Sequence, residues 1–226
     1  MKTIIGIAGV KTSGKSTAAN IIKEILKNEN VHESALADKL KNTCASVFNL
    51  ERNQFDFQEL KEVEFKEPMK LGVYEIGSIL ESFGIYMSTR EIDSLFTVVN
   101  MDLKSPRQIA QIVGTEILRT AGDADVHCKN VNVNDNGITI ISDLRFPNEF
   151  EYFSKDPDSN FIPIYIQRDE AEQYVTEDSH PSEKCVFEFS GKCKTINNNG
   201  SLEQLQYQIM TELMEAGLIS QDAKRL

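Results

Sequence analysis

The chain has 226 residues and a formal net charge of −11, with 40% hydrophobic and 8% aromatic residues. That apolar content is enough for a packed core, while the negative charge argues against a protein that holds a polyanion along a broad basic face. No window of the sequence approaches the apolar length needed to span a bilayer, so we expect a soluble protein.

Two features bear on the compartment. The apolar run near the N-terminus is interrupted by Gly14, Lys15 and Ser16 before any cleavage-like segment, so we expect a strand rather than a signal peptide. The four cysteines are scattered, with no Cys-x-x-Cys pair and no histidine at zinc-ligand spacing. Reduced thiols in a cytoplasmic protein are the plain interpretation.

The N-terminal segment predicts a strand, a glycine-rich turn and a helix in that order. Residues 3–8 are mostly β-branched and apolar, as in a central parallel strand covered on both faces. Apolar residues then recur at helical spacing from Ala18 to Leu26. Farther on, "SALADKLKNTCASVF" predicts a short strand and a helix, with Asp38 near the helix start, where its carboxylate can accept hydrogen bonds from backbone amides.

The middle of the chain, 49–104, is charged, is interrupted by proline and glycine, and has a helical pattern only in places such as "YEIGSILESF". We interpret it as an inserted, mostly helical and mobile subdomain between core segments 1–48 and 105–226. In the following run, "RQIAQIVGTEILRT", the apolar residues form one helical stripe, which leaves Arg107 and Arg119 free to face a ligand. The same pattern fits a packed helix with solvated arginines.

Strands and helices alternate through the rest of the chain. A buried strand ends at Asp143 and passes through Pro147 into a helix, since proline suits a first helical turn, and "FIPIYIQR" predicts another strand. We expect a polar, acidic loop or lid at about 169–191, then a short strand "CKTI", a final helix capped by Ser201 and a disordered end. This alternation predicts an α/β protein with a parallel sheet flanked by helices.

Gly9, Gly14, Lys15 and Ser16 satisfy the pattern G-x-x-x-x-G-K-[S/T] of phosphate-binding P-loops. In such a loop the glycines let backbone amides turn inward around a phosphate, the lysine brings charge to the outer phosphates and the serine can ligate magnesium. A glycine-rich turn that merely ends a strand is the alternative. The strand before and the helix after favour the phosphate site, and the absence of an N-K-x-D motif argues against a GTPase.

A kinase also needs a second anion site, with arginines aimed at the transferred phosphoryl group. The stretch "SDLRFPNE" suggests one, because Asp143 at a strand end can hold magnesium or its water and Arg145 points to the same side if the strand continues. Open α/β sheets bind ligands at that edge. The alternative is a salt bridge between Arg145 and Glu149 at the helix start.

Six motifs stand in the order seen in phage-type deoxynucleoside monophosphate kinases, which the chain resembles over most of its length. They are "GVKTSGKST", "LADKLK", "RQIAQIVGTEILR", "SDLRFPNE", "IQR" with "DSHPSE" after it, and "INNNGSLEQL". The likeness is weak in 49–104, and the segment 121–137 is shorter and more polar than the family's helix there. The resemblance implies a P-loop NTPase three-layer fold of the adenylate-kinase type, with a helical acceptor-binding insertion at about 49–104 and a lid at about 169–191.

The resemblance also implies an activity: ATP, with Mg²⁺, would give its γ-phosphoryl group to a deoxynucleoside monophosphate. The reaction centre would hold Lys15, Asp143, Arg145 and Arg168, and magnesium would lie at Ser16 and Asp143. ATP would contact Gly9, Lys11, Ser13, Gly14, Lys15, Ser16, Thr17, Asn198, Asn199 and Gly200, the last three at adenine. The acceptor would contact Asp38, Lys39, Lys41, Arg107, Gly114, Thr115, Arg119, Arg145 and Glu149. His180 and Glu183 would lie in the lid, and we do not expect His180 to be catalytic.

Two alternatives stay open. A related small-molecule kinase, of the dephospho-coenzyme A or phosphomevalonate type, would use the same loop with another acceptor pocket. A non-catalytic nucleotide sensor would close its lid on ATP without turnover and would need no second anion site; the four arginines at 107, 119, 145 and 168 favour a kinase. The family resemblance adds the expectation of a homodimer in a host cytoplasm, and nothing in the sequence predicts nucleic-acid or membrane binding.

Overall fold

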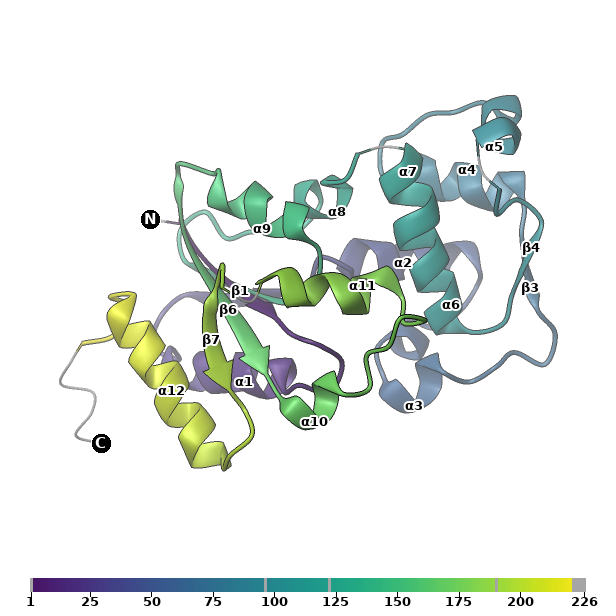
Figure 1. Ribbon diagram of the computed structural model, residues 1–226. Coiled ribbons are helices and arrows are strands. Elements are labelled where there is room, and N and C mark those ends of the chain that lie inside the picture. Colours follow the sequence, from purple (N-terminus) through teal and green to yellow (C-terminus); the bar gives the residue numbers. More distant parts are fainter. Residues whose placement is uncertain (1, 96, 122, 190, 221–226) are drawn as a thin grey trace. The chain divides into compact units, whose positions relative to one another are not determined.

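A computed structural model describes residues 2–95, 97–121, 123–189 and 191–220 (Figure 1). The chain divides into two compact units, one made of Met1–Ala35 and Asn132–Leu226, the other of Leu36–Val131. We call them the sheet unit and the helical unit. The C-terminal residues 221–226, for which the sequence predicts disorder, lie outside the described residues.

The sheet unit is built on a five-stranded parallel sheet with the order β2-β5-β1-β6-β7. The strands are β1 (Lys2–Ala8), β2 (Val31–Ser34), β5 (Ile138–Leu144), β6 (Ser159–Gln167) and β7 (Lys194–Asn197). Because β1 is central and covered on both faces, its apolar residues are continuous rather than alternating, and Ile4, Ile5, Ile7 and Ala8 are at most 1% exposed. The prediction of an α/β protein with a parallel sheet is confirmed.

Helices cover both faces of this sheet, an arrangement compatible with a three-layer α/β fold (Figure 1). On one face, α1 (Lys15–Ile25) and α12 (Leu202–Glu215) share an apolar core with isoleucines of β1, β5, β6 and β7. On the other, α9 (Pro147–Ser154) contributes Phe150, whose ring meets those of Phe161 and Phe189 edge-on, with centroids 5.6 and 6.1 Å away.

Local signals in the sequence set several element ends. Pro147 begins α9, and the Ser201 hydroxyl caps α12 by accepting from the Gln204 backbone N–H, so both predicted helix starts are confirmed. β5 runs one residue past Asp143, to Leu144. The polar segment after β6 contains α10 (Asp169–Glu172), α11 (Pro181–Lys184) and a 3₁₀ helix at Cys185–Phe189.

The helical unit contains α2 (Asp38–Val47), α3 (Gln58–Lys61), α4 (Val73–Ser82), α5 (Thr89–Leu95), α6 (Pro106–Gln111), α7 (Arg119–Ala121), α8 (Val126–Lys129) and a 3₁₀ helix at Arg52–Phe55. It includes all of 49–104 and extends beyond it on both sides. The sequence did not predict its antiparallel strand pair, β3 (Met69–Leu71) with β4 (Met101–Leu103). Strands of three residues are too short to show alternation.

The helix predicted after Pro106 is present but changes its hydrogen bonding midway, since Ile112–Leu118 is a π-helix between α6 and α7. In a π-helix the backbone hydrogen bonds join residues five apart, whereas in an α-helix they join residues four apart. The Gly114 carbonyl oxygen lies 3.2 Å from His127 Nε2 and is hydrogen-bonded to it. A Cβ on Gly114 would lie 2.9 Å from a Leu40 methyl group, so glycine permits this close packing.

Within the described ranges, no helix has both the length and the apolar character needed to cross a membrane. No disulfide joins any of the four cysteines to another residue that the structure describes: Cys44 and Cys128 are buried, and Cys185 and Cys193 are partly buried.

Candidate functional site

A glycine-rich loop, residues 9–14, joins β1 to α1 at the carboxyl ends of the parallel strands. Gly9 and Gly14 have φ angles of 148° and 103°, and Thr12 has a φ of 64°. A Cβ on Gly9 would lie 2.6 Å from Ser13 Oγ, and one on Gly14 would collide with the side-chain amide of Asn198. Glycine is therefore required at both positions.

Two side chains of this loop and the adjoining helix turn inward. Lys15 Nζ donates to the carbonyl oxygens of Gly9 and Val10, at 2.7 Å each. Ser13 is completely buried, and its hydroxyl has no hydrogen-bond partner in the described part of the chain. A buried hydroxyl without a partner costs free energy, which marks this loop as a place that a ligand or an ordered water completes.

A carboxylate is already seated against the loop. Glu183, from α11, accepts a hydrogen bond from the Lys11 backbone N–H (3.1 Å) and pairs with the Arg145 guanidinium (2.8 Å). Its side chain is only 15% exposed. Burial opposes its ionisation, but Arg145, the Lys11 N–H and the charge of Lys15 prevail, so the pKa of Glu183 lies below its ordinary value. The structure thus stabilises a negative group at this position.

The segment after β5 orients Arg145. Glu149 is 3% exposed, and its Oε2 accepts hydrogen bonds from the backbone N–H groups of Arg145 (2.7 Å) and Phe146 (3.1 Å). The Arg145 guanidinium pairs with Glu183, while Glu149 binds the Arg145 backbone N–H. Asp143 lies on the same strand end and is half-buried. Glu149 therefore anchors the backbone of Arg145 and Phe146.

Arg168 follows β6 and is the N-cap residue of α10. Its guanidinium pairs with Glu170 (2.9 Å) and donates to the Thr12 carbonyl oxygen of the glycine-rich loop (3.5 Å). The loop between β7 and α12 reaches the same place, because Asn198 Nδ2 donates to Ser13 O at 2.7 Å. Sequence positions far apart in the sheet unit therefore converge on residues 9–14.

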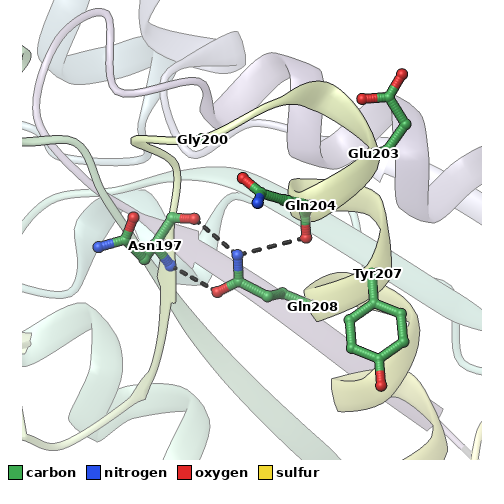
Figure 2. A pocket seen from close by; sticks show the side chains of 6 residues that line it. All are labelled: Asn197, Gly200, Glu203, Gln204, Tyr207 and Gln208. Carbon is green, nitrogen blue, oxygen red and sulfur yellow. Dashed lines mark hydrogen bonds between the residues drawn. The ribbon is translucent and has the colours of Figure 1, made fainter.

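A hollow of about 390 Å³ lies beside that last loop (Figure 2). Its lining residues are Asn197, Gly200, Glu203, Gln204, Tyr207 and Gln208. The Gln208 side-chain amide is hydrogen-bonded to both the backbone N–H and the C=O of Asn197, so it is held in place. The ring of Tyr207 is 56% exposed at the edge. Of the three residues predicted to contact adenine, Gly200 lines this hollow, whereas Asn198 and Asn199 bind Ser13 O and the Asp169 N–H.

The residues predicted to bind an acceptor, other than Arg145 and Glu149, belong to the helical unit. Arg107 is 22% exposed and pairs with Glu62 at 2.6 Å, and Arg119 donates to the Ala124 carbonyl oxygen at 2.8 Å. The expectation that both arginines are left free is therefore wrong. Long cationic side chains at a helix surface bind nearby oxygens when these are within reach, which the sequence stripe alone does not reveal.

A charged network surrounds the start of α2. Asp38 pairs with Arg52 (2.7 Å), Lys41 pairs with Asp56 (3.0 Å), and Arg52 also contacts Asp56. Opposing charges hold the pKa of Asp56 below its ordinary value although burial acts to raise it. Arg52 is thus the centre of the cluster.

The other predicted acceptor residues are engaged with protein groups or lie in the π-helix. Lys39 Nζ donates to Asn130 Oδ1 (2.6 Å) and lies 4.8 Å from the centre of the Phe83 ring. Gly114 and Thr115 lie in the π-helix, the first buried and the second half-buried.

Oxygen donors for a hard cation are present at the loop. The hydroxyls of Ser16 and Thr17 lie exposed in the first turn of α1, and the Asp143 carboxylate lies at the end of the neighbouring strand β5. No group of three or more His, Cys, Asp or Glu side chains that could hold a metal occurs among the residues that the structure describes. Magnesium is commonly bound by one or two protein oxygens, waters and substrate phosphates, so Ser16 and Asp143 fit it.

Sequence reasoning missed two of these features. Glu183 was placed only in the lid, and its contact with Lys11 spans 172 positions, for which no local pattern exists. Arg52 was not singled out. It lies four residues before Asp56, a local spacing that could have indicated the pair, but it also binds Asn42 and Asp38, which precede it by 10 and 14 residues.

Comparison with known proteins adds nothing to this picture, since no family model and no curated protein matches the chain.

Proposed function

We propose that the loop 9–14 is a P-loop that binds the phosphates of ATP, and that the protein is an ATP-dependent deoxynucleoside monophosphate kinase. The observation that carries the proposal is the seated carboxylate: Glu183 is held at the loop by the Lys11 N–H and by Arg145. Carboxylates and phosphate oxygens are bound by the same donors. A site that stabilises a carboxylate therefore supports the binding of a phosphate group.

The positions of the cations support phosphoryl transfer rather than binding alone. Lys15 has its ammonium group inside the loop, and Arg145 and Arg168 approach the loop from the ends of β5 and β6. Phosphoryl transfer depends mainly on positioning and on cations that stabilise charge on the equatorial oxygens. We assign these three side chains to that task, with Glu149 holding the backbone of Arg145 in place.

The donor's base and metal have candidate positions in the sheet unit. The hollow beside Gly200 offers side-chain amides and an exposed tyrosine ring, which suit a planar heterocycle such as adenine. Ser16 and Asp143 would hold magnesium, which would neutralise charge on the nucleotide's phosphates. The segment 169–191 would act as the lid that excludes water.

We assign the acceptor to the helical unit. Its predicted residues include Asp38, Lys39, Lys41 and Arg107, of which the last two are paired with carboxylates. The phosphate group of a nucleoside monophosphate would replace Asp56 as the partner of Lys41 and Glu62 as the partner of Arg107, because a phosphate forms the same charge-assisted hydrogen bonds as a carboxylate. Arg52, which bridges Asp38 and Asp56, joins this set.

The test is ADP formation from ATP and Mg²⁺ with each deoxyribonucleoside and ribonucleoside monophosphate in turn. We expect turnover with one or several deoxynucleotides and a fall of about 10²-fold or more in Lys15→Ala, the scale of losing one transition-state charge contact. Lys23→Ala is the matched control, because Lys23 lies on the same helix but pairs with Glu33 on the surface. Full activity of Lys15→Ala would refute the assignment. ATP binding without turnover for any acceptor would favour a nucleotide sensor or another small-molecule kinase.

A further inference from the structure

The contact between Glu183 and the glycine-rich loop has a definite geometry. One carboxylate oxygen, Oε2, lies 3.1 Å from the Lys11 backbone nitrogen, and the other, Oε1, lies 2.8 Å from an Arg145 guanidinium nitrogen. Each oxygen therefore has its own donor. The contact joins the lid segment to both the loop and the end of β5.

Local bonds shape the turn that presents this carboxylate. Ser179 Oγ accepts from the Thr176 N–H, His180 Nδ1 accepts from the Ser182 N–H, and Lys184 Nζ donates to Glu177 O. Pro181 occupies the first turn of α11, where its fixed φ suits the helix. Glu183 is thus aimed by a preorganised turn, not by a long flexible segment.

The groups around Glu183 are those that a nucleotide phosphate would need. The Lys11 N–H, the Arg145 guanidinium and the positive charge of Lys15 all act on the carboxylate. The buried hydroxyl of Ser13, for which the described residues offer no hydrogen-bond partner, lies in the same loop. Two negative groups cannot share these donors, because each would lose hydrogen bonds and repel the other.

We propose that Glu183 is an internal competitor for nucleotide phosphate, occupying the anion site of the free protein and leaving it when a polyphosphate binds. This inference rests on the proposed function. The carboxylate holds the lid segment against the loop, and the arriving phosphates release it. Ligands with a single phosphate group have few contacts with which to displace it, so the device favours di- and triphosphates over inorganic phosphate.

The consequence for binding is a reduced apparent affinity, since only the fraction of molecules with Glu183 displaced is competent. If the seated form dominates by about tenfold, removing the carboxylate's charge raises polyphosphate affinity by about tenfold. Glu183→Gln is the suitable change, because it keeps the size of the side chain and removes the negative charge. Glu188→Gln is the matched control: Glu188 is exposed in the following 3₁₀ helix, and its side chain makes no hydrogen bond or ion pair with another described residue.

The experiment is isothermal titration calorimetry of the wild type, Glu183→Gln, Glu188→Gln and a second variant, Glu183→Ala. The probes are the β,γ-methylene analogue of ATP with Mg²⁺, inorganic tripolyphosphate and adenosine. Thermal unfolding of each variant checks that it is folded. We expect both Glu183 variants to bind the analogue and tripolyphosphate at least about fivefold more tightly, while Glu188→Gln and all affinities for adenosine stay unchanged.

The outcomes separate the two proposals. If the wild type binds the analogue and both Glu183 variants bind it with equal or lower affinity, the competitor proposal is refuted, whereas the proposal of a P-loop is not. An equal gain for adenosine, or the same gain in Glu188→Gln, would also overturn it, because the effect would not depend on the anion site. Failure of every folded variant to bind any phosphate probe would instead refute the proposed function and, with it, the competitor.

Discussion

Glu149 gives the sharpest test of how the end of β5 is held. Its buried carboxylate accepts the backbone N–H groups of Arg145 at 2.7 Å and Phe146 at 3.1 Å, both at Oε2. Replacing Glu149 by alanine leaves both donors without this acceptor in a nearly closed environment. Hydrogen bonds to a charged group contribute roughly 1.5–3 kcal/mol each, so we expect Glu149→Ala to lower the free energy of unfolding by about 3–5 kcal/mol.

Urea unfolding followed by circular dichroism measures this change, and a fall of about 10 °C in Tm should accompany it. Glu149→Gln keeps an oxygen that can accept both bonds and should retain most of the stability. Glu151→Ala is the control, because Glu151 is exposed on the same helix, pairs with Lys155 and should leave stability essentially unchanged. An unfolding free energy of Glu149→Ala within about 1 kcal/mol of the wild type would refute the anchoring role, since even one orphaned buried donor costs more.

The remaining predictions concern backbone, pH and thiols. Gly14→Ala, at a φ of 103° and against the Asn198 amide, should destabilise the protein by about 1–3 kcal/mol in urea unfolding and weaken ATP binding measured by calorimetry. Gly77→Ala should instead stabilise it by about 0.5–1 kcal/mol in urea, because its Cβ meets Ile92 at an ordinary 3.5 Å inside α4. The lowered pKa of Glu183 means that its contribution is complete above the ordinary glutamate pKa of about 4.3 and is lost as pH falls through the folded value. Acid titration of stability below pH 5 should therefore be steeper for the wild type than for Glu183→Gln; equal slopes would count against the ion pair. Burial raises the pKa of Cys44 and Cys193 to about 12, so iodoacetamide at pH 8 should modify both slowly in the native protein and rapidly in urea, as mass spectrometry would detect.

Elements with strong local signals were predictable from the sequence. The central strand β1 has the unbroken apolar run of a strand buried on both faces, and Pro147 and Ser201 mark helix starts by local chemistry. The glycines at 9 and 14 were recognised by spacing, and their φ values show why no other residue fits.

The rest depends on contacts between distant segments. An α-helix and a π-helix carry nearly the same apolar stripe, so the change at Ile112 has no periodic signature. Arg107 was expected to be free, but it pairs with Glu62. Glu62 directly follows α3, in a segment whose sequence has no periodicity that would predict this contact. The sequence assigns Glu183 to a polar segment, but its contacts with the Lys11 N–H and the Arg145 guanidinium follow only from the fold.

The central claim is that residues 9–14 hold nucleotide phosphates through their backbone and Lys15. Calorimetric titration of ATP with Mg²⁺ into the wild type, Lys15→Ala and Lys23→Ala tests it most directly. The account predicts saturable binding to the wild type and Lys23→Ala and at least about tenfold weaker binding to Lys15→Ala, the loss expected for one charge-assisted contact. Equal affinity of all three proteins, or no ATP binding by the wild type, would contradict it.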